Sequence, residues 1–429
     1  MTSALSRWPG GKAALLLGGA LLAAYLLFVL VGVGLLQHNE LFHLPKHPDL
    51  YGDVAANIAE GNGYRLRAEG CETMFREPGY ILTVAAVYSL FGENPEAARA
   101  VNVLLLGLAA WLTFLLAVRV GVPKPGARLA GLLVLVFPSV VFSMLRVSPE
   151  ILFSTLILAT LLRMTTALQR PTTGNFALAG LFLALTALTR TIVLPFAPVF
   201  ALLALYALRR SPGFQAALAR CAAFCLVFGL VFGLWPLRNY LLSQHMVVTA
   251  TVSGDALFQG MYTSKLANSG LPYHRILQEA TREQRRVLER EDIPYWGDFY
   301  QFHEKLEDEL RHSAAFKAEV LREYRQDPML FVNSVCRHVW AFWFKGRTTR
   351  SSLLVAAYMA PLLLAAGLGL RRVYRSAAIR PTLLFMLTTY LLHLPILAHS
   401  RHSVYMVPLL AVLAACNLAP GQQGKESRA

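Results

Sequence analysis

The sequence predicts an all-α polytopic membrane protein with about ten transmembrane helices. Of its 429 residues, 55% are hydrophobic and only 15% are charged, whereas about a quarter of the residues in an ordinary soluble domain are charged. The apolar residues form runs close to the length of about 20 residues that a helix needs to cross a hydrocarbon core. Short basic clusters separate these runs, so the formal net charge of +15 indicates membrane orientation rather than nucleic-acid binding.

The first apolar run, residues 13–36, contains no charged residue. It is longer than the apolar core of a secretory signal, which has about 7 to 15 residues, and no small-residue cleavage site follows it. We therefore expect a retained helix. Nine further runs complete the predicted spans: residues 97–120, 130–145, 151–168, 176–188 (short for a span), 192–208, 221–242, 352–370, 382–398 and 404–418.

A cytoplasmic N-terminus places every basic connection on one side of the membrane, as the positive-inside bias requires. Both termini are then cytoplasmic, and we expect the chain in the plasma (inner) membrane. The basic residues on the cytoplasmic side are Arg7, Lys12, Arg119, Lys124, Arg128, Arg163, Arg170, Arg209, Arg210, Arg220, Arg371, Arg372, Arg375, Arg380, Lys425 and Arg428.

The domain organisation follows from this predicted membrane topology. Residues 1–242 form an N-terminal transmembrane module that includes a first outer loop, 37–80. Residues 243–350 are an extracytoplasmic helical region, which we expect to form a small cap because its charged segments carry apolar residues at helical spacing. Residues 351–420 hold the C-terminal transmembrane helices, and 421–429 a disordered tail. The apolar run at 79–91 is too short to span and predicts an interfacial helix.

Two aspartates in the first outer loop are the first candidates for chemistry. The residues after Asp49 and Asp53 have the pattern of an amphipathic helix. One interpretation is that Asp49 serves merely as the N-cap of that helix and has no catalytic role. Capping explains Asp53 less well, because Asp53 lies inside the helix, four residues after Asp49. A carboxylate at a membrane surface can act as a general base, so both aspartates remain candidates.

A carboxylate and three arginines share the same outer side. Glu150 opens a predicted span, where it could favour the helix dipole or form a second acid of a polar cavity. Arg190, Arg238 and Arg401 lie on the outer side against the positive-inside bias. Such residues line polar pathways or pair with acids, although long side chains can also reach lipid headgroups. A guanidinium is well suited to binding a phosphate.

The sequence gives no support for a cofactor or a metal site. It has no Walker-type glycine loop, no dinucleotide-binding fingerprint and no GxSxG motif. The histidines at 38, 43 and 47 do not have the fixed spacing of metal ligands. We therefore expect no cofactor and assign no metal ligand, while a requirement for a divalent metal stays open.

The order of several short motifs resembles the GT-C membrane glycosyltransferases that are related to protein O-mannosyltransferases and lipid A aminoarabinose transferases. The likeness runs through most of the chain. In chain order the motifs are Gly61-Asn62-Gly63-Tyr64, Arg76-Glu77-Pro78-Gly79-Tyr80, Leu90-Phe91-Gly92, Ser148-Pro149-Glu150, Leu188-Thr189-Arg190, Trp235-Pro236-Leu237-Arg238-Asn239-Tyr240, Tyr324-Arg325-Gln326-Asp327-Pro328, and Arg401-His402 through Pro408.

The resemblance implies a reaction and a set of site residues. Members transfer a sugar from a polyprenyl-phosphate carrier, usually with inversion, to a hydroxyl or phosphate at the outer face, and an acid of the first outer loop is the base or orients the acceptor. The family position of that acid lies nearer Asp49, so the likeness does not decide between Asp49 and Asp53. Residues implied to bind donor phosphate or substrate are Arg76, Glu77, Glu150, Arg190, Arg238, Arg401, His402 and Tyr405.

The chain departs from the pattern at His402 and Tyr405, where many relatives have an aromatic residue beside the arginine and then a proline. The expected function is sugar transfer from a polyprenyl-phosphate donor to a lipid, glycan or protein acceptor. The alternative is a transporter or flippase of lipid-linked saccharides. A transporter typically has broken helices at mid-membrane, whereas the polar residues here gather on one side, which favours the enzyme.

Overall fold

The structure is a computed structural model that describes residues 50–209, 213–294, 303–346 and 348–418. Across these ranges the chain folds into helices, and an isolated bridge between Arg65 and Glu72 is the extent of β-pairing. The predicted all-α class is confirmed. The predicted first span at 13–36, the candidate Asp49 and the tail at 421–429 lie outside the described residues.

Within the described ranges, six helical segments are long and apolar enough to cross a membrane. A seventh is formed by α5 (Lys124–Val136) and α6 (Pro138–Met144) if this pair, bent by 53°, is one broken span. The six are α4 (Pro95–Arg119), α7 (Glu150–Gln169), η2 with α9 (Thr191–Val193 and Phe196–Leu208), α10 (Phe214–Phe232), α16 (Thr349–Val373), and η4, α18 and η5 (Ser400–Met406, Val407–Ala415 and Cys416–Leu418). The predicted number of ten spans stays a prediction.

Several predicted spans differ from the observed helices. The run at 176–188 becomes α8 (Thr173–Thr189) and the run at 382–398 becomes α17 (Arg380–His393), helices of 17 and 14 residues. The run at 221–242 is not one helix, because α10 ends at Phe232 and α11 (Leu234–Ser243) follows it. Pro236 has no N–H to continue the hydrogen-bond ladder, which favours a break in the turn before it.

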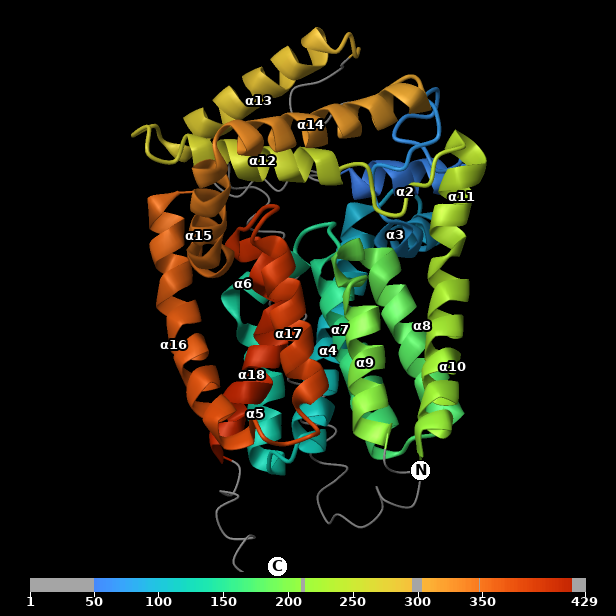
Figure 1. Cartoon of the computed structure of the whole chain (residues 1–429), viewed down its shortest axis with the longest axis vertical. Coiled ribbons are helices and arrows are strands. Elements are labelled where there is room, and N and C mark those ends of the chain that lie inside the picture. The colour runs from blue at the N-terminus through green and yellow to red at the C-terminus, as the bar shows by residue number, and fades with distance from the viewer. Residues whose placement is uncertain (1–49, 210–212, 295–302, 347, 419–429) are drawn as a thin grey trace, which may run out of the picture.

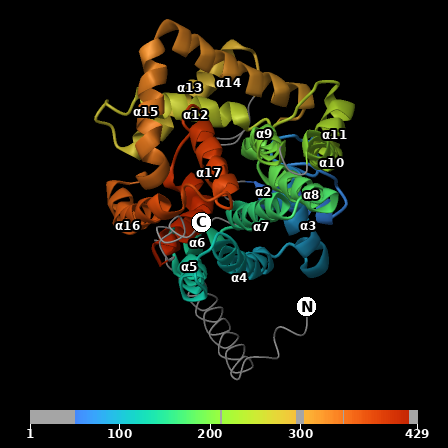
Figure 2. The same cartoon turned by 60° about the horizontal axis from the view of Figure 1, so that its bottom comes forward.

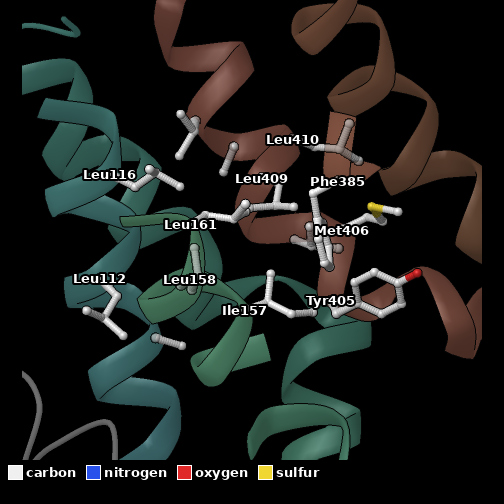
Figure 3. Packing of buried hydrophobic residues seen from close by; sticks show 14 of the residues in the cluster. Leu112, Leu116, Ile157, Leu158, Leu161, Phe385, Tyr405, Met406, Leu409 and Leu410 are labelled. Carbon is white, nitrogen blue, oxygen red and sulfur yellow. The ribbon is translucent and has the colours of Figure 1, made fainter. Parts of the chain in front are cut away.

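The core of the bundle lies around α7 and α18. The apolar windows of these two segments are 61% and 72% buried, against 17% for α10 on the outside. Figure 3 shows how they meet: the side chains of Leu158 and Leu161 of α7 lie between those of Leu112 and Leu116 of α4 and that of Leu409 of α18. Apolar burial of this kind holds the ends of α7 and α18 at fixed positions, and the candidate site is built on those ends.

Six further helices lie at one end of the bundle, at the top of Figure 1. Two come from the first outer loop, α2 (Tyr51–Ala59) and α3 (Pro78–Phe91). Four follow α11: α12 (Ser253–Lys265), α13 (Tyr273–Arg290), α14 (Leu306–Gln326) and α15 (Pro328–Phe344). Helices α12 to α14 form a layer over the bundle and α15 leads back to α16 (Figure 2). This layer has a core of its own around Phe258, Phe316 and Val320.

Candidate active site

The centre of the candidate site is a buried carboxylate held between two arginines. Oε1 of Glu150 accepts hydrogen bonds from Arg190 Nη2 at 2.9 Å and from Arg401 Nε at 2.7 Å. The Glu150 side chain is 3% exposed, while those of Arg190 and Arg401 are 19% and 32% exposed. Two guanidiniums meet one carboxylate in this cluster, the Glu150 triad, and the partly exposed arginines form its accessible edge.

Each member of the triad is positioned by a helix end. Glu150 is the first residue of α7, where a negative charge favours the helix dipole, and Arg190 follows the last residue of α8, where a positive charge does so. Arg401 lies in η4, which leads into the buried α18. The sequence left open whether Glu150 favours the helix dipole or belongs to a polar site. In the structure Glu150 is the first residue of α7 and its carboxylate binds the two arginines.

The motif Arg76-Glu77-Pro78-Gly79-Tyr80 attaches the first outer loop to this triad. Oε1 of Glu77 accepts hydrogen bonds from the hydroxyl of Thr191 at 2.8 Å and from its backbone N–H at 3.3 Å, next to Arg190. Gly79 lies so close to α8 that a Cβ there would be 2.6 Å from Oγ1 of Thr189. Glu77 is thus a positioning residue for the turn that carries Arg190.

Aromatic rings enclose the triad on the bundle side. The ring of Phe153 lies 5.8 Å from Cζ of Arg190 and packs edge-on against the buried Tyr405, 5.1 Å between centroids. The ring of His402 lies 5.3 Å from that of His393. Nδ1 of His402 accepts a hydrogen bond from the backbone N–H of His399 at 3.3 Å, which closes the first turn of η4. Tyr405 and His402 thus share η4 with Arg401, and their rings pack this helix against α7 and α17.

Arg238 lies in a second cluster, at the start of the cap. Its Nη2 donates to Oε2 of Glu72 and its Nη1 to the carbonyl of Thr73, both at 2.9 Å. Its Cζ lies 4.7 Å from the ring centroid of Tyr64 and 5.2 Å from that of Trp235. Arg238 thus holds the first outer loop against α11. It is not a member of the Glu150 triad.

Asp53 and Arg76 belong to a third group around α2. Asp53 lies in the first turn of α2 and is partly buried, and Cζ of Arg76 lies 5.1 Å from the ring centroid of Tyr51 in the same turn. The position directly before α2 is held by Leu50, with φ 63° and no side-chain cap, while Asp49, the predicted N-cap, lies outside the described residues.

Sequence reasoning missed Lys345, Tyr273 and His399, which lie beside η4. The carbonyl of Lys345 accepts from the N–H of Ser400 at 3.1 Å and from its hydroxyl at 2.9 Å. Nζ of Lys345 lies 4.7 Å from the ring centroid of Tyr273, whose hydroxyl is 3.3 Å from Nε2 of His399. Burial lowers the pKa of Lys345 to about 8. No pattern in the sequence links these distant positions.

A buried acid of the cap was missed as well. Oε1 of Glu309 accepts from the N–H of Met74 at 3.0 Å and from the hydroxyl of Thr251 at 2.6 Å, and its Oε2 from the hydroxyl of Thr73 at 2.7 Å. Burial raises the pKa of Glu309, although these bonds oppose the shift. Glu309 therefore ties α14 to the outer loop between the two loop helices.

The arrangement suits an anion better than a metal. Among the described residues no group of three His, Cys, Asp or Glu could hold a metal ion. The exposed edge of the triad belongs to Arg190 and Arg401, whose planar guanidiniums match phosphate oxygens. A partly dehydrated positive site of this kind stabilises a phosphate more strongly than the same charges would in water.

The chain has similarities to known proteins. The family model described as dolichyl-phosphate-mannose-protein mannosyltransferase matches residues 76–235, which hold Glu77, Glu150 and Arg190. The chain is also similar to the crystal structure of ArnT from Cupriavidus metallidurans bound to undecaprenyl phosphate, at 16% identity and a TM-score of 0.42 over 96% of this chain and 78% of that one. The apo structure of the same protein gives 14% identity and a TM-score of 0.39 over 95% and 78%.

A search of curated proteins found no match. The family match bears out the resemblance to the GT-C membrane glycosyltransferases that the sequence indicated.

Proposed function

Since the chain is related to the GT-C membrane glycosyltransferases, we propose that it transfers a sugar from a polyprenyl-phosphate carrier to a lipid, glycan or protein acceptor at the extracytoplasmic face. The observation that carries this proposal is the Glu150 triad. It offers two partly exposed guanidiniums at the end of the bundle where the first outer loop attaches. The description of the matching family names a dolichyl-phosphate-linked sugar, which is a donor of the same chemistry.

Arg190 and Arg401 are proposed to bind the carrier phosphate. When the bond between the anomeric carbon and the phosphate oxygen breaks, the electron pair stays on that oxygen and the phosphate gains negative charge. Fixed guanidiniums in a partly dehydrated site stabilise this charge as it develops. Glu150 holds both arginines in place before the donor binds, so that little reorganisation is needed during the reaction.

Asp53 or Asp49 is proposed to act on the acceptor. A hydroxyl attacks the anomeric carbon from the side opposite the phosphate, its proton passes to the carboxylate, and the configuration of the sugar is inverted. An acceptor hydroxyl has a pKa far above 7, so a carboxylate within hydrogen-bond reach is needed as the new bond forms. If the acceptor is itself a phosphate, the aspartate orients it instead.

The test begins with cells that lack the protein. We expect them to accumulate a lipid-linked sugar and to lose one surface glycan, and extraction of both defines the donor and the product. Wild-type protein should restore the product. Asp53→Asn and Asp49→Asn should be examined singly and together, and the double variant should restore less than about 1% of it, because a general base contributes about 100-fold or more.

Arg401→Gln should reduce transfer with a rise in the apparent KM for the donor, while Arg371→Gln serves as the matched control. Arg371 is an exposed arginine in the last turn of α16 and makes no contact with the triad. Full activity of a correctly inserted Asp49→Asn/Asp53→Asn protein would refute the assigned base. Unchanged donor use by both Arg401→Gln and Arg190→Gln would refute the phosphate site.

The transporter alternative rests on the bend between α5 and α6, since broken helices are common in transporters. Pro138 at the start of α6 is sufficient to cause this bend. The two functions differ in their product: an enzyme separates the sugar from its carrier, whereas a flippase moves the intact lipid-linked saccharide. Release of free polyprenyl phosphate by purified protein with donor and acceptor would exclude a flippase as the sole activity.

A further inference from the structure

A cavity of about 580 Å³ lies at the end of the bundle opposite the Glu150 triad. It is lined by the last turns of α7 and α9 and by the connection between α16 and α17. Glu150 opens α7 and the cavity lies at its other end, about 30 Å away at a rise of about 1.5 Å per residue. The lower ends of α9 and α17 mark this region in Figure 1. The cavity is therefore separate from the candidate active site.

The polar part of the cavity is positive. Arg209 and Arg380 both line it, and among the described residues that line it there is no carboxylate. Arg209 extends over the ring of Tyr206, 4.2 Å from its centroid, which keeps the guanidinium at the rim. Arg380 is the first residue of the 14-residue helix α17, whose positive dipole end adds to the charge. An anion is the complementary ligand.

Thr165, Gln169 and Ser376 also line the cavity, but most of the remaining wall is apolar and continues along helices that are apolar enough to span the membrane. Leu168 of α7 and Leu203 and Leu208 of α9 contribute to it, and both helices belong to segments apolar enough to span the membrane. A free inorganic anion would gain nothing from these leucines. A molecule with a phosphate headgroup and a hydrocarbon chain would satisfy both parts of the wall.

We infer that this cavity binds an anionic phospholipid, with the phosphate between Arg209 and Arg380 and an acyl chain along the leucine wall. The volume is within the range of about 300 to 1,000 Å³ of small-molecule sites. Charge complementarity selects an anionic headgroup, because a zwitterionic lipid carries a cation that the two arginines repel. The site is independent of the glycosyltransferase proposal, since none of the triad residues lines it.

The test compares binding of phosphatidylglycerol and phosphatidylcholine to the purified full chain by native mass spectrometry. Wild-type protein should prefer phosphatidylglycerol by about tenfold, the equivalent of one charge-assisted hydrogen bond. The double variant Arg209→Gln/Arg380→Gln should lose this preference. The double variant Arg371→Gln/Arg375→Gln should keep it, because these exposed arginines at the same end do not line the cavity, and Arg375 stacks on Tyr374 as Arg209 does on Tyr206.

A third variant separates a bound lipid from a bound phosphate ion. Ala207→Trp fills the cavity with apolar volume and leaves its charge unchanged, so it should also weaken phosphatidylglycerol binding. Inorganic phosphate at millimolar concentration should not displace the lipid. Equal loss in the two double-arginine variants would show only diffuse surface charge and would overturn the proposal. Full binding to Ala207→Trp, or displacement by inorganic phosphate, would overturn it too. Thermal melting of each variant confirms that the protein is folded.

Discussion

At the scale of single residues, the Glu150 triad shows how one carboxylate organises charges from three parts of the chain. The residue is 3% exposed, so its charge depends on Arg190 and Arg401 for compensation. Removal of water from charges is costly, and a buried ion pair returns that cost only when the hydrogen bonds are well formed. The bonds at 2.7 and 2.9 Å meet this condition. Stability and donor binding therefore both depend on Glu150.

Glu150→Gln should destabilise the protein by about 3 kcal/mol, because it leaves two arginines without their carboxylate in a partly buried site. Thermal or denaturant unfolding in detergent measures the change. Glu69→Gln is the control, since Glu69 is an exposed carboxylate in the same outer half of the molecule. If the two variants have the same stability, Glu150 is not the anchor of the arginines.

At the scale of elements, the start of α3 is locked against the end of α8. A Cβ on Gly79 would lie 2.6 Å from Oγ1 of Thr189 and 2.9 Å from the carbonyl of Leu188, whose backbone cannot move away cheaply. The same contact lets Glu77 reach Thr191. The two elements therefore position Arg190 jointly.

Gly79→Ala should destabilise the protein by about 1 to 3 kcal/mol and reduce transfer activity, because the added methyl group separates α3 from α8. Gly107→Ala is the matched control: it is also a helical glycine, with nothing within 4 Å of the new Cβ. In that position alanine should be neutral or stabilising by up to about 1 kcal/mol. Unfolding midpoints and activity of the two variants check the prediction. Equal behaviour would contradict the proposed close contact.

The cap should respond to acid through His303. Burial lowers the pKa of His303 from 6.5 to about 4, and the neighbouring His312 adds to this effect. The neutral form is thus favoured in the folded state, so the unfolded chain binds the proton first as the pH falls below 6.5. Stability from this group is complete above pH 6.5 and is lost between pH 6.5 and about 4.

His303→Gln should remove this acid-dependent loss, which is worth roughly 3 kcal/mol in the free energy of unfolding between pH 6.5 and about 4. The difference in unfolding free energy between wild type and variant, followed over this pH range, measures the loss. Glu309 acts in the opposite direction, because burial raises its pKa, but it is present in both proteins. His312 and Asp255, 3.2 Å apart, also face His303 in both. The exposed His245→Gln is the control. A pH profile of stability parallel to that of wild type would contradict the assignment.

At the scale of the whole molecule, the two ends of the bundle differ in character. One end carries the Glu150 triad, the loop helices and the cap; the other carries the cavity lined by Arg209 and Arg380 and the basic connections. The basic connections predict that the cavity end faces the cytoplasm. The proposed sugar transfer would then take place on the extracytoplasmic side. The proposed phospholipid site would lie in the cytoplasmic leaflet of the membrane.

Cysteine labelling tests this orientation. In a cysteine-free background, Asn62→Cys should react with a membrane-impermeant maleimide in intact cells, and Thr173→Cys only after permeabilisation. Asn62 precedes α3 in the outer loop, and Thr173 is exposed at the start of α8. The reversed pattern would place the candidate active site on the cytoplasmic side.

Composition and hydrophobic runs determined the all-α membrane class and most helix positions, because the period and length of apolar runs are local properties of the chain. The same local reasoning identified Glu150, Arg190 and Arg401 as unusual residues, since charges beside apolar runs are costly. Local sequence patterns do not show that these three residues form one cluster. The same reasoning also placed Arg238 in the same class, although the structure ties Arg238 to Glu72 instead.

Which polar groups come into contact depends on the tertiary structure. Glu150 and Arg401 are 251 positions apart, and Glu309 lies 236 positions from Thr73. Such contacts depend on how α7, α8 and α18 pack, and packing is set by the shapes of many side chains together rather than by any single segment. The cavity at the opposite end arises in the same way, whereas the break between α10 and α11 has a local cause in Pro236. The amino-acid sequence alone indicates the membrane environment and most of the helices, whereas the packing of those helices brings the site residues together.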